Sequence, residues 1–291
     1  MNDMNDNKNL PSFLVIGATK AGTTWLYQRL AKHKELWLPP VKELHYFDTL
    51  YPLPEFKKNS SNQKKYVFDS ILANLRRHVM SKENSDRDYI TYLTDIIKEP
   101  IFSLEWYISC FNHDHAKGKI CGEVTPSYAT LPNDGILYLK KILPNVKIIY
   151  ILRDPVERAV SHVKMLAKFR AENNKEVDLI SLCDSPRVIA SSNYKSIIPL
   201  WRKHFNDQNL IIMPFEKIKY DPKGFLKSIK EFLLLDNDFD DFNLTKKENE
   251  SINIDLPPEV MKKLESKFKE QQDYFFQEFG NKLFFTNDKH D

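Results

Sequence analysis

This 291-residue chain has few cysteines, no long apolar run and no leader-like segment. Its three cysteines, Cys110, Cys121 and Cys183, are odd in number and form no Cys-x-x-Cys pair. A disulfide framework or a structural zinc site is therefore not expected, and a reducing compartment is favoured. No apolar run approaches the length of a membrane span, and the polar residues 1–10 lack the apolar part of a secretory signal. The sequence thus predicts a cytoplasmic protein without a membrane span.

A strong excess of charge of one sign is also lacking. The formal net charge is +3, so no general role in coating nucleic acid follows, and we expect anions to bind only at local sites. Hydrophobic residues, in contrast, make up 42% of the chain, which is enough for a substantial core. No repeat or interdomain linker is present, so we predict a single domain over 1–291, with residues 1–10 as a loose tail.

Strand-like and helix-like segments alternate along the chain. Wholly apolar or apolar-rich runs at 13–17, at the start of 147–155 and at 209–218 predict buried strands, and 119–126 is a weaker candidate. Strands followed by helices indicate an α/β fold with a central parallel sheet flanked by helices. Residues 51–115 carry no clear strand signal, and we interpret them as inserted helices and loops. Residues 256–280 predict an amphipathic helix that prolines open and Gly280 ends.

The segment GATKAGTTWLYQRL, residues 17–30, resembles a phosphate-binding loop whose lysine is displaced. Gly17 and Gly22 have the spacing of the nucleotide P-loop, but Thr23 occupies the position of its lysine, and Lys20 lies two residues before Gly22. A strand, a glycine turn and a helix N-terminus form an anion site from backbone N–H groups. We expect these donors from residues 21 to 24 (Ala21, Gly22, Thr23 and Thr24), with Lys20 reaching a terminal phosphate.

A second anion site is predicted in IYILRDPVERAVSHVKM, residues 149–165. Arg153 follows a predicted strand, where α/β folds place ligand contacts, and Ser161 lies about two helical turns later. A guanidinium and a hydroxyl can clamp a phosphate between them. The alternative for Asp154 is helix capping, because Asp-Pro before a helical run is a cap signature. We expect Arg158 to face solvent or to be a supporting charge.

Together these segments resemble sulfotransferases that use 3′-phosphoadenosine 5′-phosphosulfate (PAPS) and release 3′-phosphoadenosine 5′-phosphate (PAP). The resemblance places the 5′-phosphosulfate on the loop of Lys20 and the 3′-phosphate on Arg153 and Ser161, within a three-layer, P-loop-like fold. Weaker matches extend it over about residues 12 to 283, including GEVTPSY, residues 122–128. The resemblance implies in-line transfer of a sulfuryl group to a hydroxyl or amine, without a metal.

The segment PPVKELHYFD, residues 39–48, resembles the bacterial and carbohydrate branch, which includes the heparan sulfate enzymes. The resemblance implies that Glu43 is the general base, and His45 is the alternative because other branches use histidine. Lys42 would lower the pKa of Glu43 and weaken it as a base. In an extended segment, however, Lys42 and Glu43 would point apart while His45 and Glu43 would share a side.

The acceptor itself is not named by the resemblance, and a saccharide or a small metabolite fits. Five aromatic residues could line an acceptor cleft, although aromatic residues lie more often in the core. They are Tyr46, Phe47, Trp106, Tyr107 and Phe111. His113 and His115 beside Asp114 are a weak metal candidate and fit a polar loop better. Lys246 or Lys247 could close over the nucleotide.

Two other functions compete with this interpretation. A P-loop-type small-molecule kinase using ATP and magnesium would need a lysine after Gly22 and a strand-end aspartate, but Thr23 and Arg153 stand at the nearest positions. A binding module that has lost its chemistry is the second alternative. The presence of Lys20 and Glu43 disfavours that module.

Overall fold

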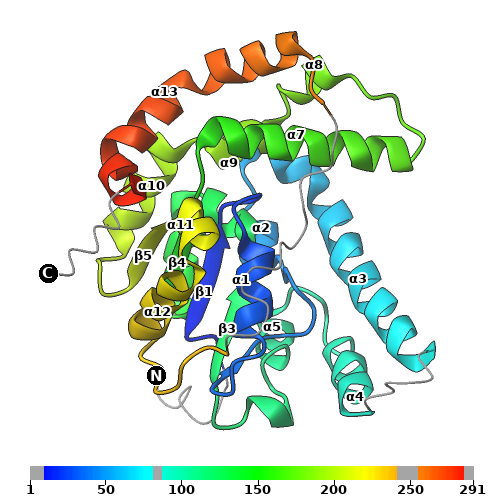
Figure 1. The fold of residues 1–291 in the computed structure, drawn as a ribbon. Coiled ribbons are helices and arrows are strands. Elements are labelled where there is room, and N and C mark those ends of the chain that lie inside the picture. Colours follow the sequence, from blue (N-terminus) through cyan, green and yellow to red (C-terminus); the bar gives the residue numbers. More distant parts are fainter. Residues whose placement is uncertain (1–9, 81–86, 241–254, 285–291) are drawn as a thin grey trace, which may run out of the picture. The chain divides into compact units, whose positions relative to one another are not determined.

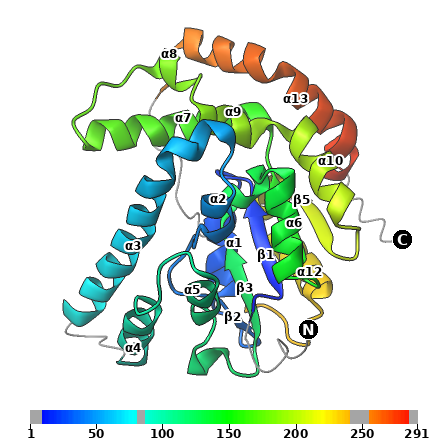
Figure 2. The same ribbon diagram turned by 180° about the vertical axis from the view of Figure 1, so that it is seen from behind.

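The computed structural model describes residues 10–80, 87–240 and 255–284, and it confirms the α/β fold (Figures 1 and 2). Five strands form a sheet in the order β2-β3-β1-β4-β5, with helices as the other main element. The strands are β1 (Phe13–Gly17), β2 (Leu36–Trp37), β3 (Ile120–Val124), β4 (Lys147–Leu152) and β5 (Leu210–Pro214). Four of them were predicted. The two residues of β2 are too few to show a periodicity.

The strand sequences follow from how the sheet is buried. All five residues of β1 are buried, as are the last five of β4. A strand covered on both faces has no polar side, so it appears in the sequence as a continuous apolar run rather than an alternation. The run that contains β5 was predicted to reach residue 218, but β5 ends at Pro214, where helix α11 (Phe215–Tyr220) begins.

The chain divides into two compact units. The first comprises residues 1–16 and 27–148, and the second comprises residues 17–26 and 149–291. Each unit is described by itself below. The prediction of one domain over the whole chain stays a prediction.

In the first unit, β1 and β2 each pair in parallel with β3, with Leu14 opposite Glu123 and Leu36 opposite Ile120. Gly122 lies under the ring of Phe13, where a Cβ atom would come within 2.0 Å of the ring. The predicted insert holds helices and turns in its described part. The helical elements of this unit are α2 (Tyr46–Leu50), η1 (Pro54–Asn59), α3 (Ser60–Met80), α4 (Arg87–Ile96), α5 (Leu104–Ser109), η2 (Asp114–Ala116), η3 (Pro126–Thr130) and α6 (Asn133–Ile142).

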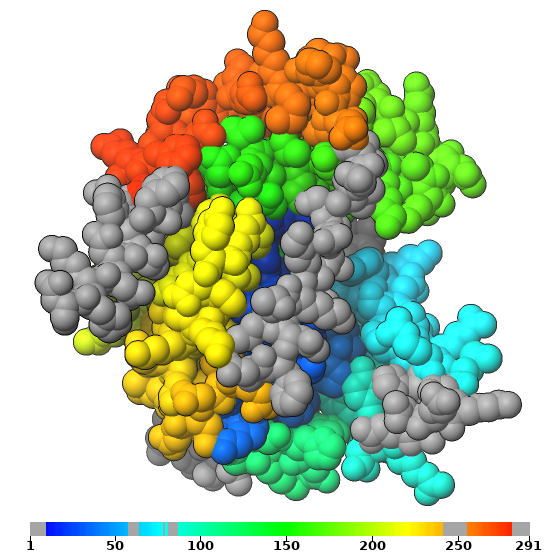
Figure 3. Space-filling model, in the orientation of Figure 1, coloured from blue at the N-terminus to red at the C-terminus, as the bar shows by residue number. Residues whose placement is uncertain are grey.

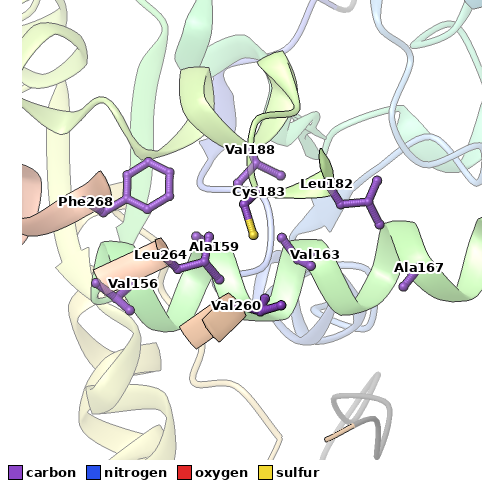
Figure 4. Close-up of a cluster of buried hydrophobic side chains, with 10 residues drawn as sticks. All are labelled: Val156, Ala159, Val163, Ala167, Leu182, Cys183, Val188, Val260, Leu264 and Phe268. Atoms are coloured by element: carbon purple, nitrogen blue, oxygen red, sulfur yellow. The ribbon is translucent and has the colours of Figure 1, made fainter. Parts of the chain in front are cut away.

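In the second unit, the long helix α13 (Pro258–Phe284) lies along α7 (Pro155–Glu172), as Figures 1 and 3 show. Apolar side chains of these two helices, of α8 (Leu179–Leu182) and of α9 (Pro186–Ser192), together with Cys183, form a buried cluster (Figure 4). The predicted C-terminal helix is confirmed, but Gly280 does not end it, because a glycine inside a helix lowers its stability without breaking it. Further helices of this unit are α10 (Tyr194–His204) and α12 (Pro222–Leu233).

Candidate active site

The loop after β1 has a backbone shape that few residue types adopt. Gly17, Lys20 and Gly22 have φ angles of 156°, 70° and 83°, and Lys20 is a non-glycine residue in the left-handed region. Such a conformation costs on the order of 1–3 kcal/mol and persists only where the surroundings impose it, most often at functional sites. The loop leads directly into helix α1 (Thr23–Leu30), as predicted for an anion site.

Gly22 is favoured by tight packing as well as by its φ angle. A Cβ atom at this position would lie 3.0 Å from the side chains of both Phe215 and Ile218, which belong to α11 of the same unit. The loop is therefore pressed against α11, and its path is set by that contact.

The predicted backbone donors are not all equivalent. The N–H of Ala21 donates to the carbonyl of Ala18 at 3.0 Å, so this amide closes the turn within the loop. The expectation that Ala21 supplies a donor for phosphate is therefore not supported. Helix geometry leaves the first N–H groups of α1, at Thr23 and Thr24, without acceptors inside the helix. Thr23 is buried, and Thr24 is half-buried.

Arg153 lies beside this loop because β4 is hydrogen-bonded to the end of β1, where the N–H of Ala18 donates to Ile151. Its Nη1 donates to the carbonyl of Lys20 at 3.3 Å, and its Nη2 donates to Glu157 at 3.1 Å. The guanidinium stacks on the ring of Phe215, 4.9 Å from its centre. The two predicted anion sites are thus adjacent parts of one site in the second unit.

Asp154 caps α7, as the alternative reading proposed. Its carboxylate accepts the N–H groups of Val156 and Glu157, both at 2.9 Å. Arg153 pairs with Glu157 rather than with Asp154, so capping does not occupy the arginine. Ser161, two turns into α7, is 6% exposed, and no hydrogen bond of its hydroxyl appears among the described residues.

Of the two alternatives for Arg158, exposure to solvent is wrong, because its side chain is completely buried, and a supporting charge stays a prediction. Its guanidinium donates to the Ser192 hydroxyl, the Val188 carbonyl and the ring of His162. Arginine is mostly exposed in proteins and is almost never fully buried without a partner, so nothing in the sequence alone indicated this burial. Only the packing of α9 over this position of α7 puts it inside.

The predicted base and its alternative lie in the first unit, in a strained segment. Glu43 and His45 have φ angles of 65° and 55°, so the segment is not extended as expected. Lys42 and Glu43 consequently do not point apart: their side chains form an ion pair at 2.5 Å. His45 does lie beside Glu43, with 3.6 Å between its Nε2 and the Glu43 carboxylate.

Asp48 completes this cluster and was missed by the sequence analysis. Its carboxylate lies 2.9 Å from Nδ1 of His45, so the imidazole stands between two carboxylates, those of Glu43 and Asp48. The spacing of three residues between His45, the N-cap of α2, and Asp48 in the first turn was a signal that could have identified the pair.

These charges shift the pKa of both predicted residues. Burial alone would lower the pKa of His45, but the Asp48 and Glu43 carboxylates outweigh it and raise the pKa to about 10. Burial would raise the pKa of Glu43, yet His45 and Lys42 lower it to about 2. At neutral pH the structure therefore holds Glu43 as a carboxylate and His45 as an imidazolium.

A buried carboxylate, Glu123 of β3, supports this segment from within the first unit. It accepts hydrogen bonds from the hydroxyls of Tyr107, Thr125 and Tyr128, each at 2.7 Å. The hydroxyl of Tyr128 in turn accepts the N–H of Tyr46, the residue after His45. Burial raises the pKa of Glu123 to about 7 despite these hydrogen bonds. In the sequence, the only sign that Glu123 matters was its position in the GEVTPSY segment, residues 122–128.

The aromatic residues considered for an acceptor cleft belong to the core. Each is at most 1% exposed, and the rings of Tyr46 and Tyr107 stack at 4.3 Å: Tyr46, Phe47, Trp106, Tyr107 and Phe111. These five side chains form part of the hydrophobic core of the first unit and do not line an open surface.

Several further predictions concern binding groups. In the described part of the chain, no group of three or more His, Cys, Asp or Glu side chains could hold a metal ion. His113 caps the short η2 turn and stacks on Trp37, in agreement with a polar loop. Lys246 and Lys247 lie outside the described residues. None of the helices searched is long and apolar enough to cross a membrane, and the cytoplasmic location stays a prediction.

Comparison with known proteins identifies a family over most of the chain. The model of the sulfotransferase family matches residues 11–241, a span that includes both sets of predicted site residues. The sequence-based prediction is thereby confirmed at the level of the family, and the kinase alternative is not favoured.

Curated relatives point the same way at low identity. Membrane-associated sulfotransferase kil1 of Dictyostelium discoideum is 27% identical over 189 residues, which are 60% of this chain and 30% of that protein. Human carbohydrate sulfotransferase 15 is 29% identical over 175 residues, 58% of this chain and 29% of that protein. Mouse heparan sulfate glucosamine 3-O-sulfotransferase 3B1 is 28% identical over 156 residues, which are 49% of this chain and 39% of that protein. The chain thus spans well under half the length of these relatives.

Solved structures show the fold over nearly the whole chain. A sulfotransferase from Alicyclobacillus acidocaldarius has a TM-score of 0.58 at 18% identity, covering 93% of this chain and 96% of that one. The sulfotransferase domain of the Synechococcus PCC 7002 olefin synthase has a TM-score of 0.51 at 18% identity, with 92% and 98% covered.

Proposed function

The chain belongs to the sulfotransferase family, and we propose that it transfers a sulfuryl group from PAPS to a hydroxyl or amine of a carbohydrate or small-molecule acceptor. The observation that carries this proposal is the adjacency of two cationic sites within the second unit. Lys20 lies in the loop after β1, and Arg153 contacts the carbonyl of that residue. A nucleotide with phosphate groups at both its 5′ and 3′ positions needs such a pair.

The donor supplies a sulfuryl group on a good leaving phosphate. In our proposal Lys20 and the first N–H groups of α1 stabilise the charge that grows on the leaving phosphate oxygen. Preorganised donors of this kind are most effective where water is excluded. Arg153 and Ser161 hold the 3′-phosphate, since a guanidinium and a hydroxyl suit an anion that is bound but does not react.

The protonation states favour Glu43 over His45 as the proton acceptor. An imidazolium with a pKa of about 10 has no free lone pair at neutral pH, whereas Glu43 is ionised. In the proposed displacement the acceptor oxygen forms the new bond to sulfur, the bond from sulfur to the phosphate breaks, and the acceptor proton passes to Glu43. His45 then orients that carboxylate and balances its charge, and Asp48 holds the imidazolium in place.

The acceptor class is supported by the relatives alone. Two of them carry names that state a carbohydrate and a heparan sulfate glucosamine as their substrates. We propose a saccharide first, with a small metabolite as the second candidate.

A thermal-shift titration tests the proposed donor. The purified protein is titrated with PAP without metal and, separately, with ATP and magnesium. A ligand that binds only the folded state raises the melting temperature by mass action. Selective stabilisation by PAP is expected. Stabilisation by ATP with magnesium alone would contradict the assignment and favour a kinase.

A further inference from the structure

Arg158 is a buried cation whose partners are all uncharged. Nε and Nη2 donate to the Ser192 hydroxyl at 2.9 and 2.5 Å, and Nη2 also donates to the Val188 carbonyl at 2.7 Å. Nη1 donates to His162 Nδ1 at 3.1 Å and, in a longer contact of 3.5 Å, to the Thr19 carbonyl. No carboxylate is among its partners in the described residues, although a buried charge is normally paired with one.

His162 does not share this charge. Arginine can only donate, so Nδ1 of His162 accepts and the ring proton resides on Nε2. Burial, followed by the positive charges of Arg158, Lys20 and Arg187, lowers the pKa of His162 well below its usual value. The ring is therefore neutral, and the region around Arg158 keeps an excess of positive charge.

The position of this charge relates it to the phosphate loop. Arg158 reaches the carbonyl of Thr19, and Arg153 reaches the carbonyl of the next residue, Lys20. Both arginines come from the junction of β4 with α7, and Ser161 follows Arg158 by one helical turn. Two guanidinium groups thus approach consecutive residues of one loop within the second unit.

We propose that Arg158 is a third, buried cation of the phosphate site, whose counter-ion is the anionic sulfuryl donor and whose Nη1 positions the loop through Thr19. This proposal rests on the proposed function. Arg158 acts through its charge and through the loop, so it is a positioning residue rather than a catalytic one. If Arg158 served only to join α7 to α9 through Ser192, its positive charge would be dispensable for binding an anion.

Three variants separate charge from packing. Arg158→Met removes the charge, Arg158→Lys keeps it, and Arg170→Met removes an exposed arginine from the same helix as the matched control. We measure the affinity for PAP by calorimetry. Loss of one buried positive charge beside the loop should raise the Kd of Arg158→Met about 10- to 100-fold, since a charge in a poorly hydrated interior acts strongly on a nearby anion.

Arg158→Lys should stay within about threefold of the wild type, and Arg170→Met should match it. An unchanged Kd in Arg158→Met, or an equally large loss in Arg158→Lys and Arg158→Met, would overturn the proposal. If Arg158→Met does not fold, Arg158→Lys decides alone, because a tenfold or greater loss there refutes a role of the charge.

The same variants separate this inference from the proposed function. If the wild-type protein does not bind PAP, the proposed function fails, and inorganic pyrophosphate becomes the probe. Pyrophosphate binding that weakens in Arg158→Met but not in Arg170→Met would still support a buried cation of an anion site. Binding of neither anion would overturn both proposals.

Discussion

Replacing His45 by Asn tests whether the imidazole is an imidazolium held between two carboxylates. Asn is the suitable substitution because His45 has a φ of 55°, in the left-handed region that Asn tolerates well. The change removes the titrating group and its contacts to Asp48 and Glu43, 2.9 and 3.6 Å away. We expect it to destabilise the protein at neutral pH and to do so less as the pH rises.

The magnitude follows from the pKa. A histidine whose pKa rises from 6.5 to about 10 on folding contributes stability that is fully present below pH 6.5 and is lost as the pH rises through 10. One pH unit within this window is worth about 1.4 kcal/mol, so the whole shift corresponds to at most about 5 kcal/mol. The lowered pKa of Glu43 reflects the same interaction with His45, so its free energy is not added to that of His45.

The assay is urea unfolding of the wild type and His45→Asn at about pH 7 and about pH 9.5. The difference in their free energies of unfolding should shrink by about 3 kcal/mol between these two values. His115→Asn, which removes an exposed imidazole from the same unit, controls for the substitution itself. An NMR titration identifies the His45 imidazole as the signal that is absent in His45→Asn.

A stability difference that is equal at both pH values would refute the reasoning, and so would a His45 signal that titrates near pH 6.5. Either result would also reopen the choice of base, since a neutral His45 could accept the acceptor proton. Asp48→Asn provides an independent check, because removing this carboxylate should lower the pKa of His45.

Three further predictions concern the second unit. Lys20→Ala should reduce turnover about 10²- to 10³-fold without unfolding the protein, because Lys20 already tolerates a φ of 70°; turnover near the wild type would remove it from the mechanism. Arg153→Ala should weaken the binding of PAP about 10- to 100-fold and that of adenosine 5′-monophosphate far less; equal losses in calorimetry would contradict a 3′-phosphate site. Gly22→Ala should destabilise the protein by about 1–2 kcal/mol in thermal unfolding and weaken PAP binding, since its Cβ would lie 3.0 Å from Phe215 at a φ of 83°; unchanged stability would show that the loop yields.

Local chemistry explains why the turn between β1 and α1 was predictable. Two glycines, a displaced lysine and two threonines follow a buried strand, and each of these features is local to residues 13–24. The same holds for Asp154, whose capping role depends on the residues two and three positions after it. The position of Arg153 beside this loop was predictable because the carboxyl ends of parallel strands meet at one edge of a sheet.

Other features depended on distant parts of the chain. The burial of Arg158 depends on α9, which supplies Ser192 and Val188 more than 25 positions later in the chain. The tight contact that favours glycine at position 22 involves Phe215, and no local sequence pattern connects Gly22 with Phe215. The aromatic residues of the insert could not be divided between core and cleft, because both environments favour the same side chains.

The sequence by itself thus determined the α/β fold, the family and the strand–turn–helix loop predicted to bind a phosphate, because strand burial, glycine turns and helix caps are encoded within a few positions. Tertiary structure alone decided the protonation of His45, the ionisation of Glu43 and the burial of Arg158. Those properties are set by distances between charges and by the exclusion of water. Both arise only when segments far apart in the sequence pack together.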